Sequence, residues 1–261
     1  MPDQPAPKKS LGQHWLDDPA SLQNICDAAH LSNEDTVLEI GPGPGSLTKL
    51  LAKHAGKVVA VELDEKLARD LPHRLKADNL EVIQADILRF DFTRLPAGYK
   101  VVANIPYYLT SNLIRILSEA ANPPAMAVLL IQKEVAERVV AQPGDMSVLS
   151  VTAQFYWAVE LGEPVSAHLF TPPPKVDSQI LILRRHAEPL FPGVDAKVFF
   201  RLVKAGFSQR RKTLLNTLSA GLQLSREQVG VLCGEAGIEP GLRAQALSLD
   251  NWHMIYRAYN P

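Results

Sequence analysis

A glycine-rich turn after an apolar segment is the first place in this sequence where the chain could hold a small molecule. Thr36–Ile40 is apolar apart from Glu39 in its centre, and glycines follow at alternate positions over Gly41–Gly45. Such glycines let the backbone approach a ligand closely, next to the N-terminus of a helix. A dinucleotide-binding turn has the spacing G-x-G-x-x-G, but Ser46 stands where its third glycine would fall. Glu39 would repel a pyrophosphate, so the turn favours a cationic cofactor such as S-adenosylmethionine.

Two further carboxylates follow apolar segments downstream. Glu62 ends the apolar segment 57–62, and Asp86 comes shortly after segment 80–84. A carboxylate in the position of Glu62 can accept both ribose hydroxyl hydrogens, and Asp86 could accept a hydrogen from an adenine amino group. Each alone is typical of a helix cap. Carboxylates after three successive strands, at the edge where parallel sheets bind ligands, together indicate a nucleoside site.

The segment Asn104-Ile105-Pro106-Tyr107 suggests what the site acts on. An exocyclic amine is a poor nucleophile because its lone pair is delocalised into the ring. If the Asn104 oxygen and a nearby backbone carbonyl accept both N–H hydrogens, the lone pair is aimed at the methyl group. Pro106 fixes the turn and has no N–H, and Tyr107 offers a π-face to a base taken out of its stack. The segment indicates amino methylation of a base, driven by positioning.

These residues need a sheet that brings them together, and the chain predicts one. Strands are expected at 36–40, 57–62, 80–84, 100–103 and 125–131, with helices at 17–29, 46–55, 65–75 and 110–119 between them. Apolar strands alternating with helices predict an α/β fold, a Rossmann-like S-adenosylmethionine-dependent methyltransferase sheet covered on both faces. Segments 156–165 and 179–183 are expected to close one edge as an antiparallel pair.

The C-terminal part of the chain reads differently. After a linker at 186–193, helices are expected at 196–207, 211–218, 226–235 and 248–259. We therefore predict two domains, a cofactor-binding catalytic domain with an N-terminal arm over residues 1–185 and a small all-helical RNA-binding domain over residues 186–261.

Charge is divided unevenly along the chain, although the net charge is only −1. Residues 184–261 hold 11 Lys and Arg against 6 Asp and Glu, whereas residues 1–183 hold 16 against 22. A basic C-terminal part favours a polyanionic partner. The densest cluster, Gln209–Lys212, is expected to open a helix. We predict contacts to RNA phosphates, which position RNA without reading its sequence, from Arg184, Arg185, Arg201, Lys204, Arg210, Arg211 and Lys212.

Composition narrows the class of protein further. With 46 % hydrophobic and 21 % charged residues the chain is typical of a globular protein. Its longest apolar run, 125–131, is far shorter than a membrane span, and the N-terminus lacks the apolar core of a signal peptide. The two cysteines, Cys26 and Cys233, form no C-x-x-C pair, which disfavours a zinc cluster or a disulfide framework. We expect a cytoplasmic protein with no metal site.

Taken together, the motifs resemble those of the ribosomal RNA adenine dimethylases, most closely the small-subunit branch. The resemblance covers nearly the whole chain. Besides the glycine turn, Val61-Glu62, Gln84-Ala85-Asp86 and Asn104–Tyr107, it rests on the segments Lys9–Leu16, Gln132–Arg138 and Phe170–Ser178. Two departures are small: Trp15 stands where the family usually has Phe, and Tyr108 where Asn or Tyr is found.

The resemblance implies a function and roles for particular residues. The family transfers methyl groups from S-adenosylmethionine to two adjacent adenosines near the 3′ end of small-subunit rRNA, giving N6,N6-dimethyladenosine, and acts on a partly assembled subunit. A monomer is the default expectation. Tyr107 and Phe170 would sandwich the target adenine, with Asn104 and Pro106 beside it. The cofactor would be bound by His14, Leu16, Gly41, Gly43, Glu62, Asp86 and Asn104.

Three alternatives stay open at this point. One is the erythromycin-resistance branch, which methylates large-subunit RNA with nearly the same catalytic residues. The sequences of the arm and of Phe170–Ser178 favour the small-subunit branch. A second is a non-catalytic assembly or transcription factor on the same fold, disfavoured by intact Glu62, Asp86 and Asn104. The third, a nicotinamide-dependent dehydrogenase, is disfavoured by the glycine spacing.

Overall fold

A computed structural model of the protein describes residues 6–8 and 11–259. The chain divides into two compact units, one formed by Met1–Ala136 and Ala158–Arg185, the other by Glu137–Trp157 and His186–Pro261. Lys9 and Ser10 of the arm motif lie outside the described residues. None of the helices in the described ranges is long and apolar enough to cross a membrane.

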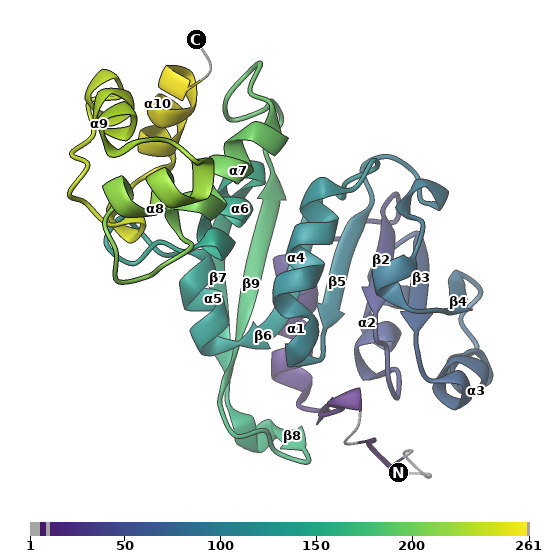
Figure 1. Ribbon diagram of the computed structural model, residues 1–261. Coiled ribbons are helices and arrows are strands. Elements are labelled where there is room, and N and C mark those ends of the chain that lie inside the picture. The colour runs from purple at the N-terminus through teal and green to yellow at the C-terminus, as the bar shows by residue number, and fades with distance from the viewer. Residues whose placement is uncertain (1–5, 9–10, 260–261) are drawn as a thin grey trace. The chain divides into compact units, whose positions relative to one another are not determined.

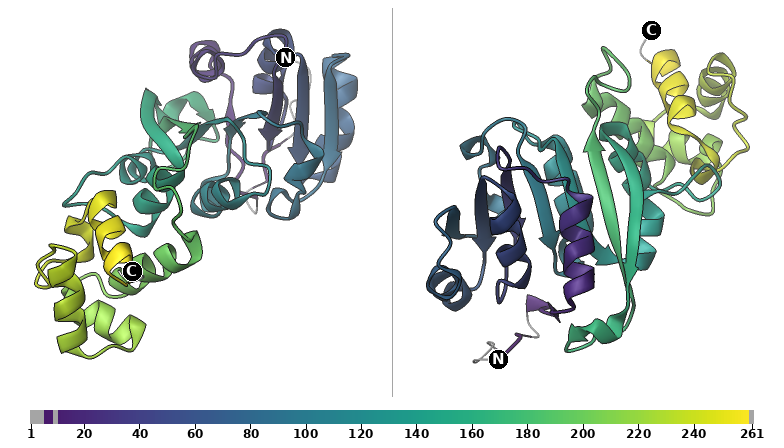
Figure 2. Two further views of the ribbon diagram at one scale, coloured as in Figure 1. Left: turned by 90° about the horizontal axis from the view of Figure 1, so that it is seen from above. Right: turned by 180° about the vertical axis from the view of Figure 1, so that it is seen from behind.

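The first unit is built on a seven-stranded sheet with the order β4-β3-β2-β5-β6-β9-β7 (Figure 1). Neighbours from β4 to β6 pair in parallel, and β9 runs antiparallel to β6. Helices α1 and α2 lie on one face and α4 on the other (Figures 1 and 2). This confirms the predicted Rossmann-like fold. The elements of the sheet are β2 (Thr36–Ile40), β3 (Lys57–Glu62), β4 (Leu80–Gln84), β5 (Lys100–Asn104), β6 (Met126–Gln132), β7 (Trp157–Val165) and β9 (Ser178–Arg185), with helices α1 (Pro19–Ala28), α2 (Ser46–His54), α3 (Glu65–Leu75) and α4 (Thr110–Glu119).

Burial of the strands explains why they occupy these positions. Every residue of β6 from Met126 to Ile131 is buried, as expected for a strand covered on both faces. Helices α1 and α2 contribute Leu22, Ile25 and Leu51 to a core under the sheet. Because β4, β3, β2 and β5 are parallel neighbours, their carboxyl ends meet at one edge.

A small second sheet lies beside this edge. Strand β1 (Trp15–Leu16) pairs antiparallel with β8 (Phe170–Thr171), so that Leu16 is opposite Phe170. The sequence predicted neither strand. Each has two residues, too few for a periodic pattern, and the pairing joins segments more than 150 positions apart. It brings the N-terminal arm to the Phe170–Ser178 segment.

The second unit is helical. It contains α6 (Val148–Tyr156), α7 (Ala196–Gly206), α8 (Leu214–Leu222), α9 (Arg226–Glu235) and α10 (Leu249–Tyr259), while α5 (Lys133–Val139) crosses from one unit to the other. Its core is aromatic: the ring centroids of Phe155 and Phe199 are 4.7 Å apart, and Trp252 is fully buried. Helix α6, which the sequence analysis did not predict, places Val151 and Phe155 in this core. Residues 137–157 therefore pack with the second unit, whereas the expected boundary at residue 185 assigned them to the first.

The expected helix at 211–218 is wrong at its start. Helix α8 begins at Leu214 after Thr213, and residues 207–212 form turns in which the Lys212 N–H donates to the Gln209 carbonyl over 3.0 Å. Three adjacent cations in the first turn of a helix would oppose the helix dipole. The basic cluster is thus a loop and does not open a helix.

Candidate active site

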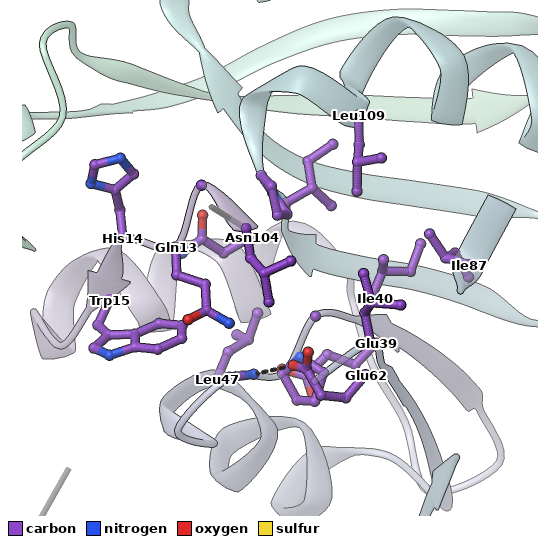
Figure 3. A pocket seen from close by; sticks show the side chains of 18 of the residues that line it. Gln13, His14, Trp15, Glu39, Ile40, Leu47, Glu62, Ile87, Asn104 and Leu109 are labelled. Carbon is purple, nitrogen blue, oxygen red and sulfur yellow. Dashed lines mark hydrogen bonds between the residues drawn. The ribbon is translucent and has the colours of Figure 1, made fainter. Parts of the chain in front are cut away.

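A pocket opens at the carboxyl ends of the parallel strands (Figure 3). All ten residues that the sequence analysis assigned to catalysis or to the cofactor line this pocket: His14, Leu16, Gly41, Gly43, Glu62, Asp86, Asn104, Pro106, Tyr107 and Phe170. Four of them lie at the carboxyl ends of four neighbouring strands of the sheet. Asp86 comes after β4, Glu62 ends β3, Gly41 follows β2 and Asn104 ends β5. Residues separated by up to 156 positions in sequence therefore share one site.

The glycine turn has the strained backbone that only glycine adopts readily. Gly41, Gly43 and Gly45 have φ values of 66°, 55° and 92°. A Cβ on Gly43 would lie 2.7 Å from a ring carbon of Trp15, so the arm packs directly on the turn. Gly45 is also the N-cap of α2. The turn thus shapes the pocket floor and receives the arm above it.

Glu62 fixes the turn through its carboxylate. Its Oε2 accepts the Gly43 N–H over 3.1 Å and its Oε1 accepts the Asp64 N–H over 2.9 Å. Burial raises the pKa of Glu62, and these two N–H groups act in the opposite direction. A carboxylate has about four acceptor positions, so Glu62 keeps capacity for hydroxyl donors of a ligand.

Glu39 lies deeper in the same pocket, on the central strand (Figure 3). It is only 1 % exposed, and its Oε2 has no hydrogen-bond partner in the described part of the chain. Burial raises the pKa of Glu39 to about 8, and the negative charge of Glu62 adds to the rise. Because an isolated buried charge is costly, Glu39 keeps its proton at neutral pH when no ligand is bound. A cationic ligand beside it would favour the ionised carboxylate.

Asp86 caps a short helix and also lines the pocket. Its Oδ1 accepts the Leu88 N–H over 2.9 Å and so caps the short helix Ile87–Arg89. It also lines the pocket, next to the end of β4. The cap sets the direction of the side chain and leaves its second oxygen for a ligand.

The Asn104–Tyr107 segment forms the wall opposite the carboxylates. Tyr107 starts a short turn, Tyr107–Leu109, and its hydroxyl lies 2.8 Å from Ser178 Oγ. Burial raises the pKa of Tyr107, which keeps the ring neutral. The sequence analysis did not select Ser178, although it is part of the Phe170–Ser178 motif and is fully buried. It fixes the ring that was expected to face the substrate.

The N-terminal arm closes the pocket on its remaining side. The Nδ1 atom of His14 lies 2.6 Å from the Pro172 carbonyl oxygen, and its ring is nearly parallel to that of Tyr107, with centroids 6.1 Å apart. Gln13, another pocket residue that the sequence analysis left out, accepts the Lys8 backbone N–H over 2.7 Å. Phe170 is 3 % exposed and packs in the core through the β1–β8 pair.

The seven predicted RNA-binding residues are divided between the two units. Arg184 and Arg185 are in the first unit and already have partners: Arg184 pairs with Glu160 over 2.8 Å, and Arg185 donates to the Ser118 carbonyl over 3.0 Å. The others are in the second unit. Arg201 and Lys204 are exposed one turn apart on α7, and the exposed loop 210–212 follows this helix. Arg201 donates to the hydroxyl of Tyr259 over 2.8 Å.

The fold and the pocket define the class of protein as a Rossmann-like methyltransferase. No group of three or more His, Cys, Asp or Glu able to hold a metal ion is present within residues 6–8 and 11–259. The sequence model of the ribosomal RNA adenine dimethylases matches residues 6–260. The chain belongs to this family.

Individual relatives agree with this assignment. A protein of Dehalococcoides mccartyi named ribosomal RNA small subunit methyltransferase A is 44 % identical over 256 residues, covering 97 % of this chain and 88 % of its own. A protein of the same name from Alkaliphilus metalliredigens is 42 % identical and covers 94 % and 88 %. Among solved structures, a dimethyladenosine transferase from Plasmodium falciparum has a TM-score of 0.81 at 28 % identity, covering 95 % of this chain and 98 % of its own. The 23S rRNA methyltransferase ErmE has a TM-score of 0.76 at 31 % identity, covering 95 % and 100 %.

Proposed function

We propose that this protein uses S-adenosylmethionine to methylate N6 of two adjacent adenosines near the 3′ end of small-subunit rRNA, giving N6,N6-dimethyladenosine. Its substrate is a partly assembled small subunit in the cytoplasm, on which it acts as a monomer during ribosome biogenesis. The observation that carries the proposal is the placement of Asp86, Glu62, the glycine turn and Asn104 in one pocket, in the order of the strands. Two relatives named ribosomal RNA small subunit methyltransferase A, which match 97 % and 94 % of this chain, support small-subunit rRNA as the substrate.

The side chains that line the pocket have the chemistry needed to bind S-adenosylmethionine. Glu39 offers a buried carboxylate oxygen that has no protein donor in the described ranges, which suits a positively charged methionine moiety. Glu62 retains acceptor positions for ribose hydroxyls, and Asp86 for an adenine amino group. His14 and Leu16 cover the site from the arm. When bound, S-adenosylmethionine supplies a methyl group on a sulfonium, which is activated for displacement.

Asn104 directs the attacking amine. Its side-chain oxygen accepts one N–H of the adenine amino group, and a neighbouring backbone carbonyl accepts the other. The nitrogen lone pair is then turned out of conjugation with the ring and aimed at the methyl group. Positioning of this kind, with electrostatic stabilisation, accounts for the rate without a general base. The amine loses its proton to water after the transfer.

Tyr107 and Phe170 hold the target base by its two faces, with Pro106 fixing the turn between Asn104 and Tyr107. The hydrogen bond between the hydroxyls of Tyr107 and Ser178 keeps the ring in place as the base enters. A base extruded from its stack loses a few kcal/mol of stacking and pairing energy, which aromatic contacts on both faces recover. Phe170 must expose its ring when the base binds, because it is 3 % exposed in the free protein.

We assign RNA binding to the helical unit and cofactor binding to the sheet unit, with the division near residue 185. Arg201, Lys204 and the loop 210–212 are exposed and carry positive charge. They contact phosphates and orient the RNA. Arg184 and Arg185 contribute less, since they are in the sheet unit, outside the helical unit to which we assign RNA binding.

Transfer of labelled methyl groups to small subunits from a strain that lacks the modification tests the proposal. Large subunits and free small-subunit rRNA are assayed alongside. Label is expected in small subunits, as dimethyladenosine. Label in large-subunit RNA would instead indicate a 23S rRNA methyltransferase, the activity for which ErmE is named. Bound cofactor without any transfer would indicate a non-catalytic assembly factor.

A further inference from the structure

Tyr108 is a large aromatic side chain at the pocket that the proposed mechanism does not use. It is 63 % exposed, the highest value for a large apolar side chain in the described part of the chain. Its neighbour Tyr107 is half-buried and tied to Ser178. Successive residues in a short turn of this kind project in different directions, so Tyr107 lines the wall and Tyr108 stands at the rim.

The arm supports this exposed ring on one side. A Cβ on Gly12 would lie 3.5 Å from both Cδ1 and Cε1 of Tyr108, so the arm passes close beside the ring. Gly12 itself has a φ of 62°, which favours glycine there. The ring is thus held at the pocket while most of its surface stays in water. Tyrosine is enriched at binding surfaces, because its ring is large and apolar and its hydroxyl is polar, and Tyr108 lines the pocket.

We propose that Tyr108 is a stacking platform for the nucleotide next to the target adenosine. This rests on the proposed function. When one of two adjacent adenosines enters the pocket, its neighbour loses a stacking partner at the pocket mouth. An aromatic ring one residue away from Tyr107 replaces that partner. Stacking of this kind accepts any base, because every base has a π-face, so the same ring serves in turn for each of the two adenosines.

The decisive variant is Tyr108→Leu, because leucine keeps an apolar contact with Gly12 and removes the π-face. Tyr108→Phe keeps the ring and removes the hydroxyl. Val231→Ala is the matched control, since Val231 is 57 % exposed on α9 and lies in no part of the pocket. For each protein, KM and kcat are measured with unmethylated small subunits, and the Kd of S-adenosylmethionine is measured by calorimetry.

Loss of one base stack corresponds to a change of roughly five- to 150-fold. Tyr108→Leu is expected to raise KM for small subunits by this factor, with the Kd of S-adenosylmethionine within about twofold of wild type. Tyr108→Phe and Val231→Ala are expected to match wild type in both quantities. The proposal is overturned if Tyr108→Leu keeps the wild-type KM, if Tyr108→Phe loses as much as Tyr108→Leu, or if cofactor affinity falls in parallel. Failure of the proposed function is distinct, because wild-type protein would then form no dimethyladenosine.

Discussion

The carboxylate of Glu62 accepts the backbone N–H of Gly43 over 3.1 Å, which joins the end of β3 to the glycine turn after β2. The residue expected to bind the ribose thus also fixes the turn that receives the rest of the cofactor. Its second oxygen accepts the Asp64 N–H. Cofactor affinity and the shape of the pocket therefore depend on the same side chain.

Glu62→Gln is expected to weaken S-adenosylmethionine binding at least tenfold and to lower the stability of the free protein. A glutamine has one acceptor oxygen where the carboxylate has two, so one buried N–H loses its partner, at a cost of about 1–3 kcal/mol. Calorimetry gives the Kd and thermal unfolding gives the Tm. Glu81→Gln, on the neighbouring strand and paired only with exposed Lys57 at 2.8 Å, is the control. Equal affinity of Glu62→Gln and wild type would contradict the account.

Asn104→Ala is expected to reduce kcat by about 100-fold or more, because the acceptor that directs the amine is lost. The Kd of S-adenosylmethionine should change only a few-fold. The measurement is single-turnover methyl transfer with cofactor in excess. Asn112→Ala on α4, whose side chain contacts only Arg115 on the surface, should keep the wild-type rate. Undiminished transfer by Asn104→Ala would remove the residue from the mechanism.

Glu39 should make the stability of the free protein depend on pH. Its pKa is raised to about 8 in the folded state from an ordinary value of 4.5. Between these values the folded protein keeps a proton that the unfolded chain has lost, so the stabilisation is complete below pH 4.5 and is lost as pH rises through 8. The Tm of Glu39→Gln minus that of wild type is therefore expected to increase as pH rises from 6 to 9, because wild type loses this stabilisation and the variant does not. Parallel Tm curves for the two proteins would show that Glu39 is already ionised.

The arm should depend on one ion pair. Lys8 Nζ lies 2.5 Å from Asp64 Oδ2, and the Asp64 side chain is 3 % exposed against 57 % for Lys8. Burial raises the pKa of Asp64, but Lys8 and the N–H groups of Leu67 and Lys66 outweigh it and lower the pKa overall. Exposed pairs contribute at most about 1 kcal/mol. Lys8→Gln is therefore expected to weaken cofactor binding two- to fivefold at low salt.

The salt dependence of this effect distinguishes the ion pair from a packing role. At high salt, the difference in Kd between wild type and Lys8→Gln should narrow, because screening weakens the attraction; it need not vanish, since Asp64 is buried and such a pair is screened less than an exposed one. Lys66→Gln, at the start of α3, is the control and should match wild type throughout. A deficit in Lys8→Gln that does not change with salt would contradict the electrostatic interpretation.

The loop 210–212 should contribute to RNA binding through charge. Replacing Arg210, Arg211 and Lys212 by Ala is expected to weaken binding to small-subunit rRNA and to reduce the slope of log K against log salt by about 2–3, since each phosphate contact contributes roughly 0.7–0.9. The control is the double variant Lys53→Ala and Arg69→Ala, which removes positive charge from α2 and α3 in the first unit and should leave the slope unchanged. An unchanged slope would place the RNA contacts on other residues.

The sequence predicted the parallel strands well because each is a short, mostly apolar segment bounded by clear turns. The expected strands at 57–62 and 80–84 coincide with β3 and β4. Seven of the ten pocket residues lie at or shortly after the carboxyl ends of parallel strands, where motif spacing can indicate a site. His14, Leu16 and Phe170 could be selected only from the resemblance. Their assigned roles remain predictions.

What the sequence did not reveal depends on long-range contacts. The β1–β8 pair has two residues on each side, and its existence depends on packing of the arm. Helix α6 is buried on several sides, and its buried residues include Ser150 and Thr152 as well as Val151 and Phe155. Its sequence therefore lacks the regular alternation of apolar and polar faces that marks a surface helix. The hydrogen bond between the hydroxyls of Tyr107 and Ser178 spans 71 positions. A motif can contain such a residue but cannot show its partner.

The most direct test of the central claim identifies the product on the RNA. Small subunits that lack the modification are incubated with the protein and S-adenosylmethionine, the rRNA is digested with nucleases, and the fragments are analysed by mass spectrometry. The account predicts two adjacent N6,N6-dimethyladenosines near the 3′ end, formed by wild type and absent with Asn104→Ala. Methyl groups at any other base, or in large-subunit RNA alone, would contradict it.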